Sequence, residues 1–292
     1  MTASRPEIVA APDAIAAAVR DARGRGRRVG FVPTMGALHA GHASLAAAAA
    51  TACDDVAVSI FVNPTQFGPH EDFHRYPRAL EADCRLLAEQ HVRWVFAPPV
   101  EAIYPPGHAT RIVVEGPALP LEGAIRPGHF SGVATVVQRL FQLVPADRAY
   151  FGAKDWQQTV VVRRMVADLG IPVEIVVLPT VREADGLAMS SRNAYLSPVD
   201  RRRAVGLHVA LLEAERDWST GVAPEAIAAG MRRTIEAHGI AVDYATVVDP
   251  ESLQPSSAPH ASAVALVAGR LGTTRLIDNR LLAADSRPGA TP

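Results

Sequence analysis

Short apolar runs alternate with helix-forming segments over residues 27–180 of the sequence. The apolar runs are bounded by Gly, Pro or Asp and have the length and residue types of buried strands. They occupy residues 28–32, 56–62, 92–96, 148–151 and 173–178. Helical patterns fill the gaps at residues 42–51, 77–90, 131–144 and 155–169. Such alternation predicts βαβ units, and therefore an α/β fold with a parallel sheet.

The pattern changes after residue 180. A polar stretch up to Asn193 precedes helical patterns at residues 197–218 and 224–238, which end at Gly221 and Gly239. Residues 242–248 and 263–277 then alternate like antiparallel strands with a hairpin. We therefore expect a first domain over residues 1–181, a smaller α+β domain over residues 182–283, and a disordered tail over residues 284–292.

Composition narrows the functional classes. The chain has 292 residues, is 49% hydrophobic, and its 29 basic and 30 acidic residues leave a formal charge of -1. This balance gives no broad positive surface for nucleic acid or an anionic membrane. No apolar run reaches 18 residues and the start lacks a signal-peptide pattern, so we expect a cytoplasmic protein. Without a CxxC spacing, Cys53 and Cys84 are interpreted as small buried hydrophobic residues.

The first chemical motif, Pro-Thr-Met-Gly-Ala-Leu-His-Ala-Gly-His at residues 33–42, follows the first predicted strand and opens a helix. Gly36 and Gly41 allow a ligand to approach the backbone, and free N–H groups at a helix start favour an anion such as phosphate. His39 and His42 lie three residues apart, so one side of a helical turn carries both imidazoles. The alternative is a glycine turn with two surface or capping histidines.

The second motif, residues 62–68, follows the second predicted strand and contains Asn63 and Gln66. Amide side chains suit the hydroxyl and carboxylate groups of a small polar substrate. The carboxyl end of a strand in an open α/β sheet is where ligands collect. The alternative is a structural turn made by the Asn-Pro pair.

The third motif, residues 151–158, ends the strand at residues 148–151 and starts the next helix. Lys154 offers a positive charge for phosphate, Asp155 is a predicted helix cap, and Gln158 lies three residues further on, where it could face the ligand. A capped helix with an exposed lysine is the alternative interpretation.

The fourth motif, Gly-Leu-Ala-Met-Ser-Ser-Arg-Asn at residues 186–193, lies between the two predicted domains. Its hydroxyl groups and Arg192 resemble a loop that closes over a triphosphate, whereas a flexible linker is the alternative. Arg126 and His129 lie in a Gly/Pro-rich loop that resembles a lid. Near Tyr76, Glu81 and Asp83 are interpreted as solvated acids in the first turn of a helix, although they could face an amine.

Taken together, these motifs resemble a known family. His-x-Gly-His after the first strand and the Met-Ser-Ser-Arg loop are similar to the paired signatures of the class I aminoacyl-tRNA synthetase and nucleotidyltransferase superfamily. Within that superfamily the chain resembles the pantothenate synthetases over residues 27–277. The resemblance rests on residues 33–36, 61–67, 126–130, 152–155 with Gln157 and Gln158, and 190–193. Ile125, Trp156 and Thr65 stand where the family usually has Thr, Tyr and Met.

The resemblance implies a Rossmann-like parallel sheet with helices on both faces, a smaller α+β C-terminal domain, and a homodimer. It also implies condensation of (R)-pantoate with β-alanine in vitamin B5 and coenzyme A biosynthesis. ATP would be cleaved to AMP and pyrophosphate, with Mg²⁺ and a pantoyl-adenylate intermediate. Forming an adenylate gives the carboxylate an AMP leaving group, which makes attack by an amine feasible.

The resemblance also assigns roles to residues. His42 would be the proton donor, with His39, Lys154 and Arg192 as the other catalytic residues. Gln66 and Gln158 would hold pantoate, and Gln66 would also border β-alanine. The metal ligands stay unknown. The ATP site would comprise Met35, Gly36, Ala37, Leu38, His39, Ala40, Gly41, His42, Gly152, Ala153, Lys154, Asp155, Val181, Met189, Ser190, Ser191 and Arg192.

Two other functions share part of this pattern. A nucleotidyltransferase would have the same histidine motif and Ser/Arg loop, but would keep the nucleotide in its product. The amide pair Gln66 and Gln158 instead favours a pocket for an uncharged polyol with a carboxylate. A nucleotide-sensing module would bind ATP without turnover, and pantoate-dependent exchange of pyrophosphate into ATP would exclude it.

Overall fold

The computed structural model describes residues 5–69, 71–256 and 262–283. The chain divides into two compact units, which we describe separately. Unit 1 comprises Met1–Ala153 and Gln157–Val181, and unit 2 comprises Lys154–Trp156 and Arg182–Pro292. The tail predicted at residues 284–292 lies outside the described residues.

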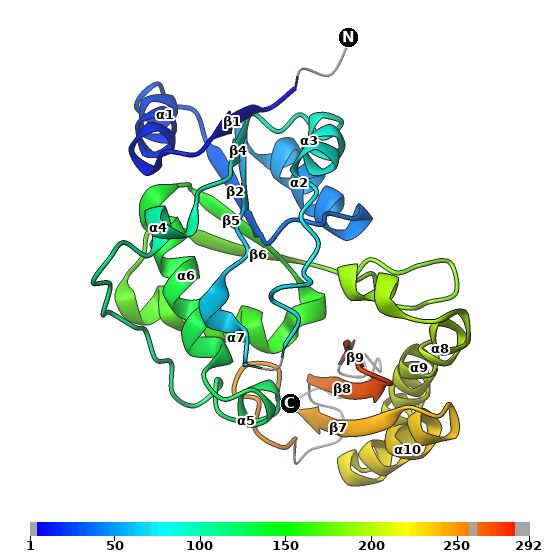
Figure 1. Ribbon diagram of the computed structural model, residues 1–292. Helices are drawn as coiled ribbons and strands as arrows, with labels where there is room; N and C mark the ends of the chain where they lie inside the picture. The colour runs from blue at the N-terminus through cyan, green and yellow to red at the C-terminus, as the bar shows by residue number, and fades with distance from the viewer. Residues whose placement is uncertain (1–4, 70, 257–261, 284–292) are drawn as a thin grey trace. The chain divides into compact units, whose positions relative to one another are not determined.

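Unit 1 contains a six-stranded sheet in which every neighbouring pair is parallel (Figure 1). The order across the sheet is β1-β4-β3-β2-β5-β6. The strand after β2 in the chain, β3, lies on one side of it, and β5 lies on the other. This makes β2 the point at which the strand order reverses, where open α/β sheets bind ligands. The strands are β1 (Glu7–Val9), β2 (Val29–Thr34), β3 (Asp55–Ile60), β4 (Trp94–Phe96), β5 (Arg148–Gly152) and β6 (Glu174–Leu178).

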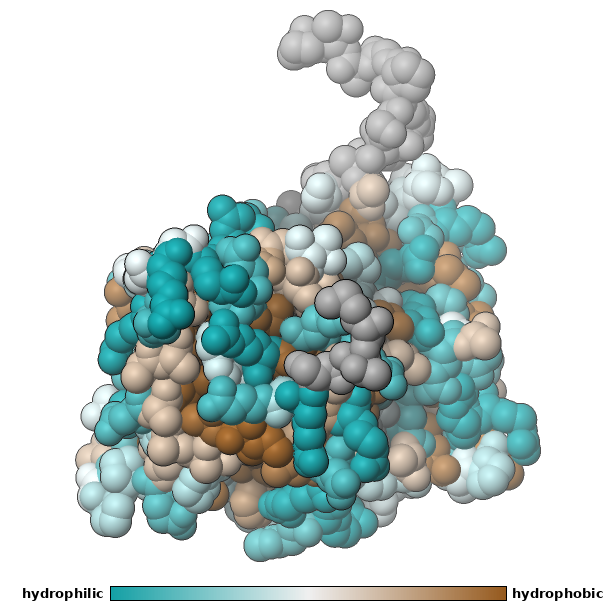
Figure 2. Space-filling model, turned by 90° about the horizontal axis from the view of Figure 1, so that it is seen from above, coloured by the Kyte–Doolittle hydropathy of each residue, from teal (hydrophilic) through white to brown (hydrophobic). Residues whose placement is uncertain are grey.

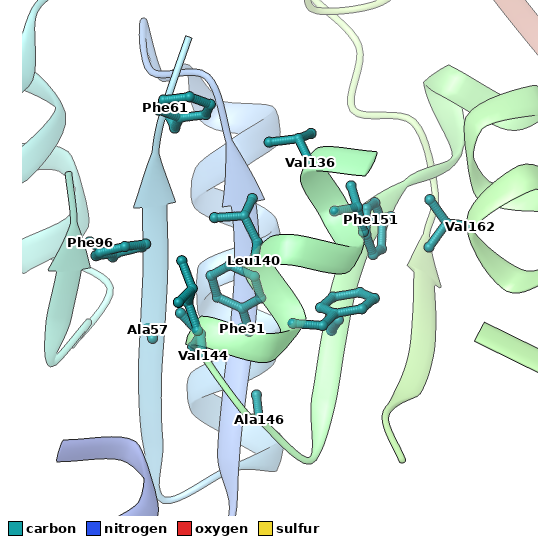
Figure 3. Close-up of a cluster of buried hydrophobic side chains, with 14 of the residues drawn as sticks. Phe31, Ala57, Phe61, Phe96, Val136, Leu140, Val144, Ala146, Phe151 and Val162 are labelled. Carbon is teal, nitrogen blue, oxygen red and sulfur yellow. The ribbon is translucent and has the colours of Figure 1, made fainter. Parts of the chain in front are cut away.

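Helices cover both faces of this sheet because side chains alternate along each strand. Phe31 and its neighbours on the same face pack with α1 (Pro12–Gly24), α6 (His129–Leu143) and α7 (Trp156–Leu169). Figure 3 shows Leu140 of α6 against this face. Val32 points to the other face, which packs with α2 (Ala40–Ala52) and α3 (Leu80–Ala88). The short helices are η1 (Pro64–Gln66), α4 (Val100–Ile103), α5 (Glu122–Ile125) and η2 (Ala153–Asp155).

The α/β prediction is confirmed, since the structure contains all five predicted strands and four predicted helices of this region. The strand β1 and the helix α1 are among the elements that the sequence did not predict. The edge strand β1 has only three residues, too few for a periodic signal. Helix α1 buries Ile15, Val19 and Ala22 at helical spacing, so its apolar pattern could have been recognised.

Unit 2 has an antiparallel sheet in the order β7-β8-β9, with β7 (Ala241–Val248), β8 (Ala263–Leu271) and β9 (Thr274–Leu282). Gly272, with φ of +57°, allows the two-residue turn between β8 and β9. The helix predicted over residues 197–218 is wrong in one respect. It is two helices, α8 (Pro198–Arg203) and α9 (Gly206–Ser219), and the ring of His238 packs where a side chain at Gly206 would lie. Helix α10 (Pro224–Ala237) packs with α9 around Trp218.

The surface fits the balanced composition. Hydrophilic residues cover much of the face seen in Figure 2, with hydrophobic residues showing between them. Within the described ranges, none of the helices combines the length and hydropathy needed to cross a membrane. Both thiols are free, with Cys84 buried and Cys53 partly exposed.

Candidate functional site

Three sequence motifs follow neighbouring strands of the unit 1 sheet. The motif at residues 33–42 spans the end of β2 and the start of α2, the Asn63 motif follows β3, and the third motif contains Gly152 at the end of β5 and Ala153 directly after it. Because all three strands are parallel, these segments leave the same edge of the sheet. The side chains of the first two motifs meet where Gln66 Nε2 lies 3.1 Å from Met35 Sδ.

A tight left-handed turn begins the loop after β2. Gly36 has φ of +81° and Ala37 has φ of +51°. A Cβ atom at Gly36 would lie 3.0 Å from Ile60 and 3.2 Å from the carboxylate of Asp83. Glycine is therefore favoured at position 36 both by backbone conformation and by space.

Asp83 of α3 holds this turn. Its carboxylate accepts hydrogen bonds from the backbone N–H groups of Ala37 at 3.1 Å and Leu38 at 2.8 Å. The side chain is buried, and this burial raises its pKa although both hydrogen bonds act to lower it. The interpretation of Asp83 as a solvated acid is therefore wrong, whereas Glu81 is exposed and pairs with Arg85.

The two histidines pack against each other and cap the start of α2. His39 Nδ1 accepts the N–H of Gly41 at 3.1 Å, and His42 Nδ1 accepts the N–H of His39 at 3.4 Å. Their ring centroids lie 4.2 Å apart. A Cβ atom at Gly41 would lie 2.9 Å from the His39 ring, so only glycine allows this packing. Because each Nδ1 accepts, the proton of each neutral imidazole is on Nε2.

Backbone N–H groups in this loop are already engaged, which corrects one expectation. We expected free N–H groups at the helix start to bind an anion, but most of them donate within the protein. Phosphate binding by the imidazoles of His39 and His42 stays a prediction. The engaged N–H groups are those of Gly36, Ala37, Leu38, His39, Gly41 and His42.

Asn63 organises the second motif. Its Oδ1 accepts hydrogen bonds from Thr65 Oγ1 at 2.9 Å and Tyr104 Oη at 2.8 Å, and its Nδ2 donates to Gln66 Oε1 at 3.1 Å. Gly132 lets α6 approach this turn, since a Cβ atom there would lie 2.4 Å from the carbonyl oxygen of Thr65. Asn63 therefore supports the turn, as the alternative interpretation held, while also orienting the amide of Gln66.

The segment predicted to be a lid is bound to unit 1 by charged hydrogen bonds. Arg126 donates to both carboxylate oxygens of Glu71, from Nε at 2.7 Å and from Nη2 at 2.6 Å. His129 Nδ1 lies 2.9 Å from the carbonyl oxygen of Gln66. These contacts favour a fixed support over a movable lid. They line a cavity of about 930 Å³ that lies within unit 1.

The motif after β5 starts α7. Lys154 Nζ lies 3.9 Å from Asp155 Oδ1, and the lysine side chain is 20% exposed. The capping role of Asp155 stays a prediction, and the side chain of Gln158 is half-buried. The adjacent Gln157 is buried, donating to the carbonyl oxygens of Pro117 and Pro120. Gln157 therefore has a structural role, and Gln158 is the more available of the two.

Val181 ends unit 1 beside the histidine loop, since a Cβ atom at Gly41 would lie 3.9 Å from Val181 Cβ. Unit 1 thus brings together the loop at residues 35–42, Gln66 and Val181. It also contains Gly152, Ala153 and Gln158, whereas Lys154, Asp155 and residues 189–192 belong to unit 2.

The Ser/Arg loop of unit 2 is well supported, which argues against a flexible linker. Ser190 Oγ accepts the N–H of Arg192 at 3.2 Å, and Asn193 Nδ2 donates to Glu183 Oε1 at 2.7 Å. Before the loop, Arg182 donates to both carboxylate oxygens of the buried Asp278, at 2.7 and 3.0 Å. The sequence pattern revealed the loop but not these supporting acids, of which Asp278 lies 96 residues from Arg182 in the chain.

The fold and the site define a doubly wound α/β protein with a paired-histidine loop at the switch point of its sheet. A family model described as pantoate-beta-alanine ligase matches residues 7–281, and the chain belongs to that family of enzymes.

Individual relatives agree with this assignment. The chain is 54% identical over 267 residues to a pantothenate synthetase of Acidiphilium cryptum, covering 91% of this chain and 96% of the relative. A crystal structure of pantothenate synthetase from Thermus thermophilus has a TM-score of 0.90 at 50% identity, covering 95% of this chain and 99% of that one. A Francisella tularensis pantoate-beta-alanine ligase, solved in complex with beta-gamma ATP and beta-alanine, has a TM-score of 0.79 at 35% identity over 94% and 97% of the two chains.

Proposed function

We propose that the protein condenses (R)-pantoate with β-alanine to give pantothenate, a precursor of coenzyme A, with ATP cleaved to AMP and pyrophosphate. The observation that carries this proposal is the His39–His42 pair at the switch point of the sheet. Its hydrogen bonds place a donor N–H at each Nε2, which suits a site that handles phosphate groups. Membership of the pantoate-beta-alanine ligase family supports the identity of the acid and the amine.

The first chemical step would activate the acid. The pantoate carboxylate attacks the α-phosphate of ATP, pyrophosphate leaves, and pantoyl-adenylate forms. As pyrophosphate leaves, negative charge develops on the oxygen that linked it to the α-phosphate. Hydrogen-bond donors that the folded protein already holds in position stabilise that charge. His42, as proton donor, and His39 serve this role from unit 1, with Lys154 and Arg192 contributing positive charge. Residues 35–42, 152–155, 181 and 189–192 form the ATP site of this proposal.

The second step joins the amine. The neutral amino group of β-alanine attacks the carbonyl carbon of the adenylate, AMP leaves, and the nitrogen loses one proton as the amide forms. Gln66 and Gln158 would hold the hydroxyl and carboxylate groups of pantoate, and Gln66 would also border β-alanine. The amide of Gln66 is already oriented by Asn63, so little conformational freedom is lost when a substrate binds.

Magnesium fits this chemistry as part of the nucleotide. In the part of the chain that the structure describes, no three His, Cys, Asp or Glu side chains are grouped to hold a metal ion. Mg²⁺ typically keeps several waters and is bound through substrate phosphates. It would therefore arrive with ATP, and its contribution would be to neutralise phosphate charge.

The decisive experiment is isotope exchange between pyrophosphate and ATP. With purified protein, Mg²⁺ and pantoate but no β-alanine, labelled pyrophosphate should enter ATP, because adenylate formation is reversible. Omitting pantoate is the control. A stable nucleotidylated product, or exchange that does not depend on pantoate, would contradict the proposal.

We also propose a homodimer formed through unit 1. Residues 110–115 belong to no helix or strand, and Val113 and Leu119 expose 70% and 64% of their surface. Large apolar side chains exposed to solvent suit burial against a second copy. Sedimentation velocity should give a dimer for the natural chain and a larger monomer fraction for V113D, whereas a natural chain that sediments as a monomer would exclude the proposal.

A further inference from the structure

The main chain of Gln66 is held by Arg126, which follows α5, and by His129, the first residue of α6. Its carbonyl oxygen lies 2.9 Å from His129 Nδ1 and 3.3 Å from Arg126 Nη2. Arg126 Nη1 in turn lies 3.0 Å from His129 Nε2. Gln66 thus has its backbone fixed from one side and its amide side chain bound by Asn63 and Met35.

The proton positions in this arrangement follow from the chemistry of the groups. A guanidinium group has donors and no acceptor, so His129 Nε2 must accept from Arg126. The imidazole proton is then on Nδ1 and is donated to the carbonyl oxygen of Gln66. Burial, and then the charge of Arg126, lowers the pKa of His129 to about 4, so the ring stays neutral and keeps this tautomer at neutral pH.

Glu71 fixes the position of Arg126. Its two carboxylate oxygens accept from Nε and Nη2, a planar two-point contact that sets the orientation of the guanidinium plane. Burial raises the pKa of Glu71, but the hydrogen bonds and charge of Arg126 outweigh this and lower it overall. The backbone N–H of Glu71 also donates to the carbonyl oxygen of Gly68 at 3.1 Å, which ties it to the same loop.

We propose that Glu71, Arg126 and His129 are positioning residues for Gln66 in the ligase reaction. They touch no substrate in this proposal. Instead, they fix the carbonyl of Gln66, and so the direction in which its side chain meets pantoate and β-alanine. The inference rests on the proposed function, because those two substrates give Gln66 its role. Displacement of a binding group by about 1 Å can cost on the order of 10²-fold in rate.

Two substitutions at one position separate this role from a general structural one. His129→Asn places an amide donor near the position of Nδ1 and can keep the bond to Gln66, but it cannot reach Arg126. His129→Gln places its amide near the position of Nε2 and can keep the bond to Arg126, but loses the bond to Gln66. Both variants remove the ring, so their losses of packing are similar.

The measurement is steady-state kinetics with each substrate varied in turn, alongside thermal unfolding. For H129Q we expect KM for pantoate and β-alanine to rise about 10-fold or more, since losing one hydrogen bond to a positioning group costs about that factor, with KM for ATP changed less than about 2-fold. H129N should recover most of this loss. Glu174→Gln, in the exposed Arg148–Glu174 pair, is the control for a surface substitution and should match the natural chain.

The outcomes are distinct. A natural chain with no pantoate-dependent turnover overturns the proposed function and this inference with it. An active natural chain combined with equal kinetics for H129N and H129Q overturns this inference alone. So does a uniform change in all three KM values, because a structural role would produce it. If H129Q does not fold, Glu71→Gln replaces it, and an unchanged KM for pantoate in that variant overturns the inference.

Discussion

Asp83 Oδ1 accepts the backbone N–H of Leu38 at 2.8 Å, which ties the first turn of α3 to the loop that carries the two histidines. The other carboxylate oxygen accepts the N–H of Ala37 in its left-handed conformation. An ionised carboxylate accepts at both oxygens, whereas an amide can accept at only one. Asp83 is therefore the residue through which α3 controls the shape of the proposed phosphate loop.

Asp83→Asn should weaken ATP binding. The NH₂ group of the asparagine would face one of the two backbone N–H groups, leaving a buried donor without an acceptor at a cost of about 1–3 kcal/mol. Part of this cost would destabilise the loop conformation that binds ATP. We therefore expect KM for ATP to rise about 10-fold. Isothermal titration with a non-hydrolysable ATP analogue measures the change in affinity directly.

Glu81→Gln is the matched control for Asp83→Asn, since Glu81 belongs to the same helical turn but is exposed. Its ion pair with Arg85 should contribute less than about 0.5 kcal/mol to stability. If D83N binds the analogue as tightly as E81Q does, Asp83 has no role in shaping the loop.

His42→Ala should reduce the rate of pyrophosphate exchange by about 10²-fold or more, the usual effect of removing one preorganised donor to a transition state. The substitution also removes the Nδ1 atom that accepts the backbone N–H of His39, so His39 loses this hydrogen bond. Single-turnover formation of AMP from ATP and pantoate would show whether the chemical step is slowed. The exposed His74 provides the control substitution, H74A.

Near-normal exchange by H42A would show that His42 is a helix cap and no more. His42→Gln adds a finer test, because a glutamine amide can donate from near the position of Nε2. A partial recovery by H42Q over H42A is expected if donation from Nε2 is the function of this side chain.

The folded protein should lose stability in mild acid through His129. Burial lowers the pKa of His129 to about 4 from 6.5. Between these pH values the unfolded chain binds a proton at this position that the folded chain excludes, so acid favours unfolding. The contribution of neutral His129 to the free energy of unfolding is fully present above pH 6.5. It falls by on the order of 3 kcal/mol as the pH decreases to 4.

The comparison of urea unfolding at pH 7 and pH 4.5 should use the difference between the natural chain and H129N. Other groups titrate in acid as well. Burial lowers the pKa of His208, which acts in the same direction, while burial raises the pKa of Asp83, which acts in the opposite direction. These contributions cancel in the difference. An equal loss of stability in both proteins would show that His129 does not exclude a proton in the folded state.

The sequence predicted the sheet well because buried parallel strands are continuous apolar runs, such as the one from Val29 to Val32. It also located the histidine loop, because a glycine-rich motif directly after such a strand has few alternative positions in an α/β fold. Both predictions depend on local pattern. Both succeed because the residues that determine each feature lie within about ten positions of one another in the sequence.

The supports of the site could not be predicted in the same way. Asp83 is 45 residues from Leu38 in the chain, and Arg126 is 55 residues from Glu71. The sequence at the start of a helix does not show whether an acidic side chain is solvated or accepts hydrogen bonds from a distant loop. A Gly/Pro-rich segment likewise suggests mobility until its ion pairs are known. Such contacts are set by tertiary packing, which a single sequence does not display.

The loop at residues 186–193 should depend on the pair formed by Arg182 and Asp278. Asp278 has a side chain that is 1% exposed, and Arg182 satisfies both of its oxygens. Arg182→Met would leave a buried carboxylate without its cation, which costs about 3–5 kcal/mol. Denaturant unfolding should show this loss, while Glu236→Gln, in the exposed Arg232–Glu236 pair, should change stability by less than about 0.5 kcal/mol. A loss in R182M no larger than in E236Q would contradict the prediction.

Lys154 offers a direct chemical test of the proposed phosphate contact, because it is the single lysine in the sequence and the other 28 basic residues are arginines. A reagent that acylates neutral amines modifies only Lys154 and the N-terminal amine, since guanidinium groups stay protonated. If Lys154 contacts the phosphates, Mg²⁺–ATP at about ten times its Kd should slow acylation of Lys154 about tenfold, because only the unliganded fraction reacts.

The N-terminal amine is the internal control in that experiment, and mass spectrometry of peptides reports both sites in the same sample. Its rate should not change with ATP, whereas ADP and AMP should protect Lys154 progressively less if the contact is to the β- or γ-phosphate. Lys154→Arg keeps the charge but cannot be acylated, so it should stay active after treatment that inactivates the natural chain. Equal rates of acylation with and without ATP would place Lys154 outside the phosphate site.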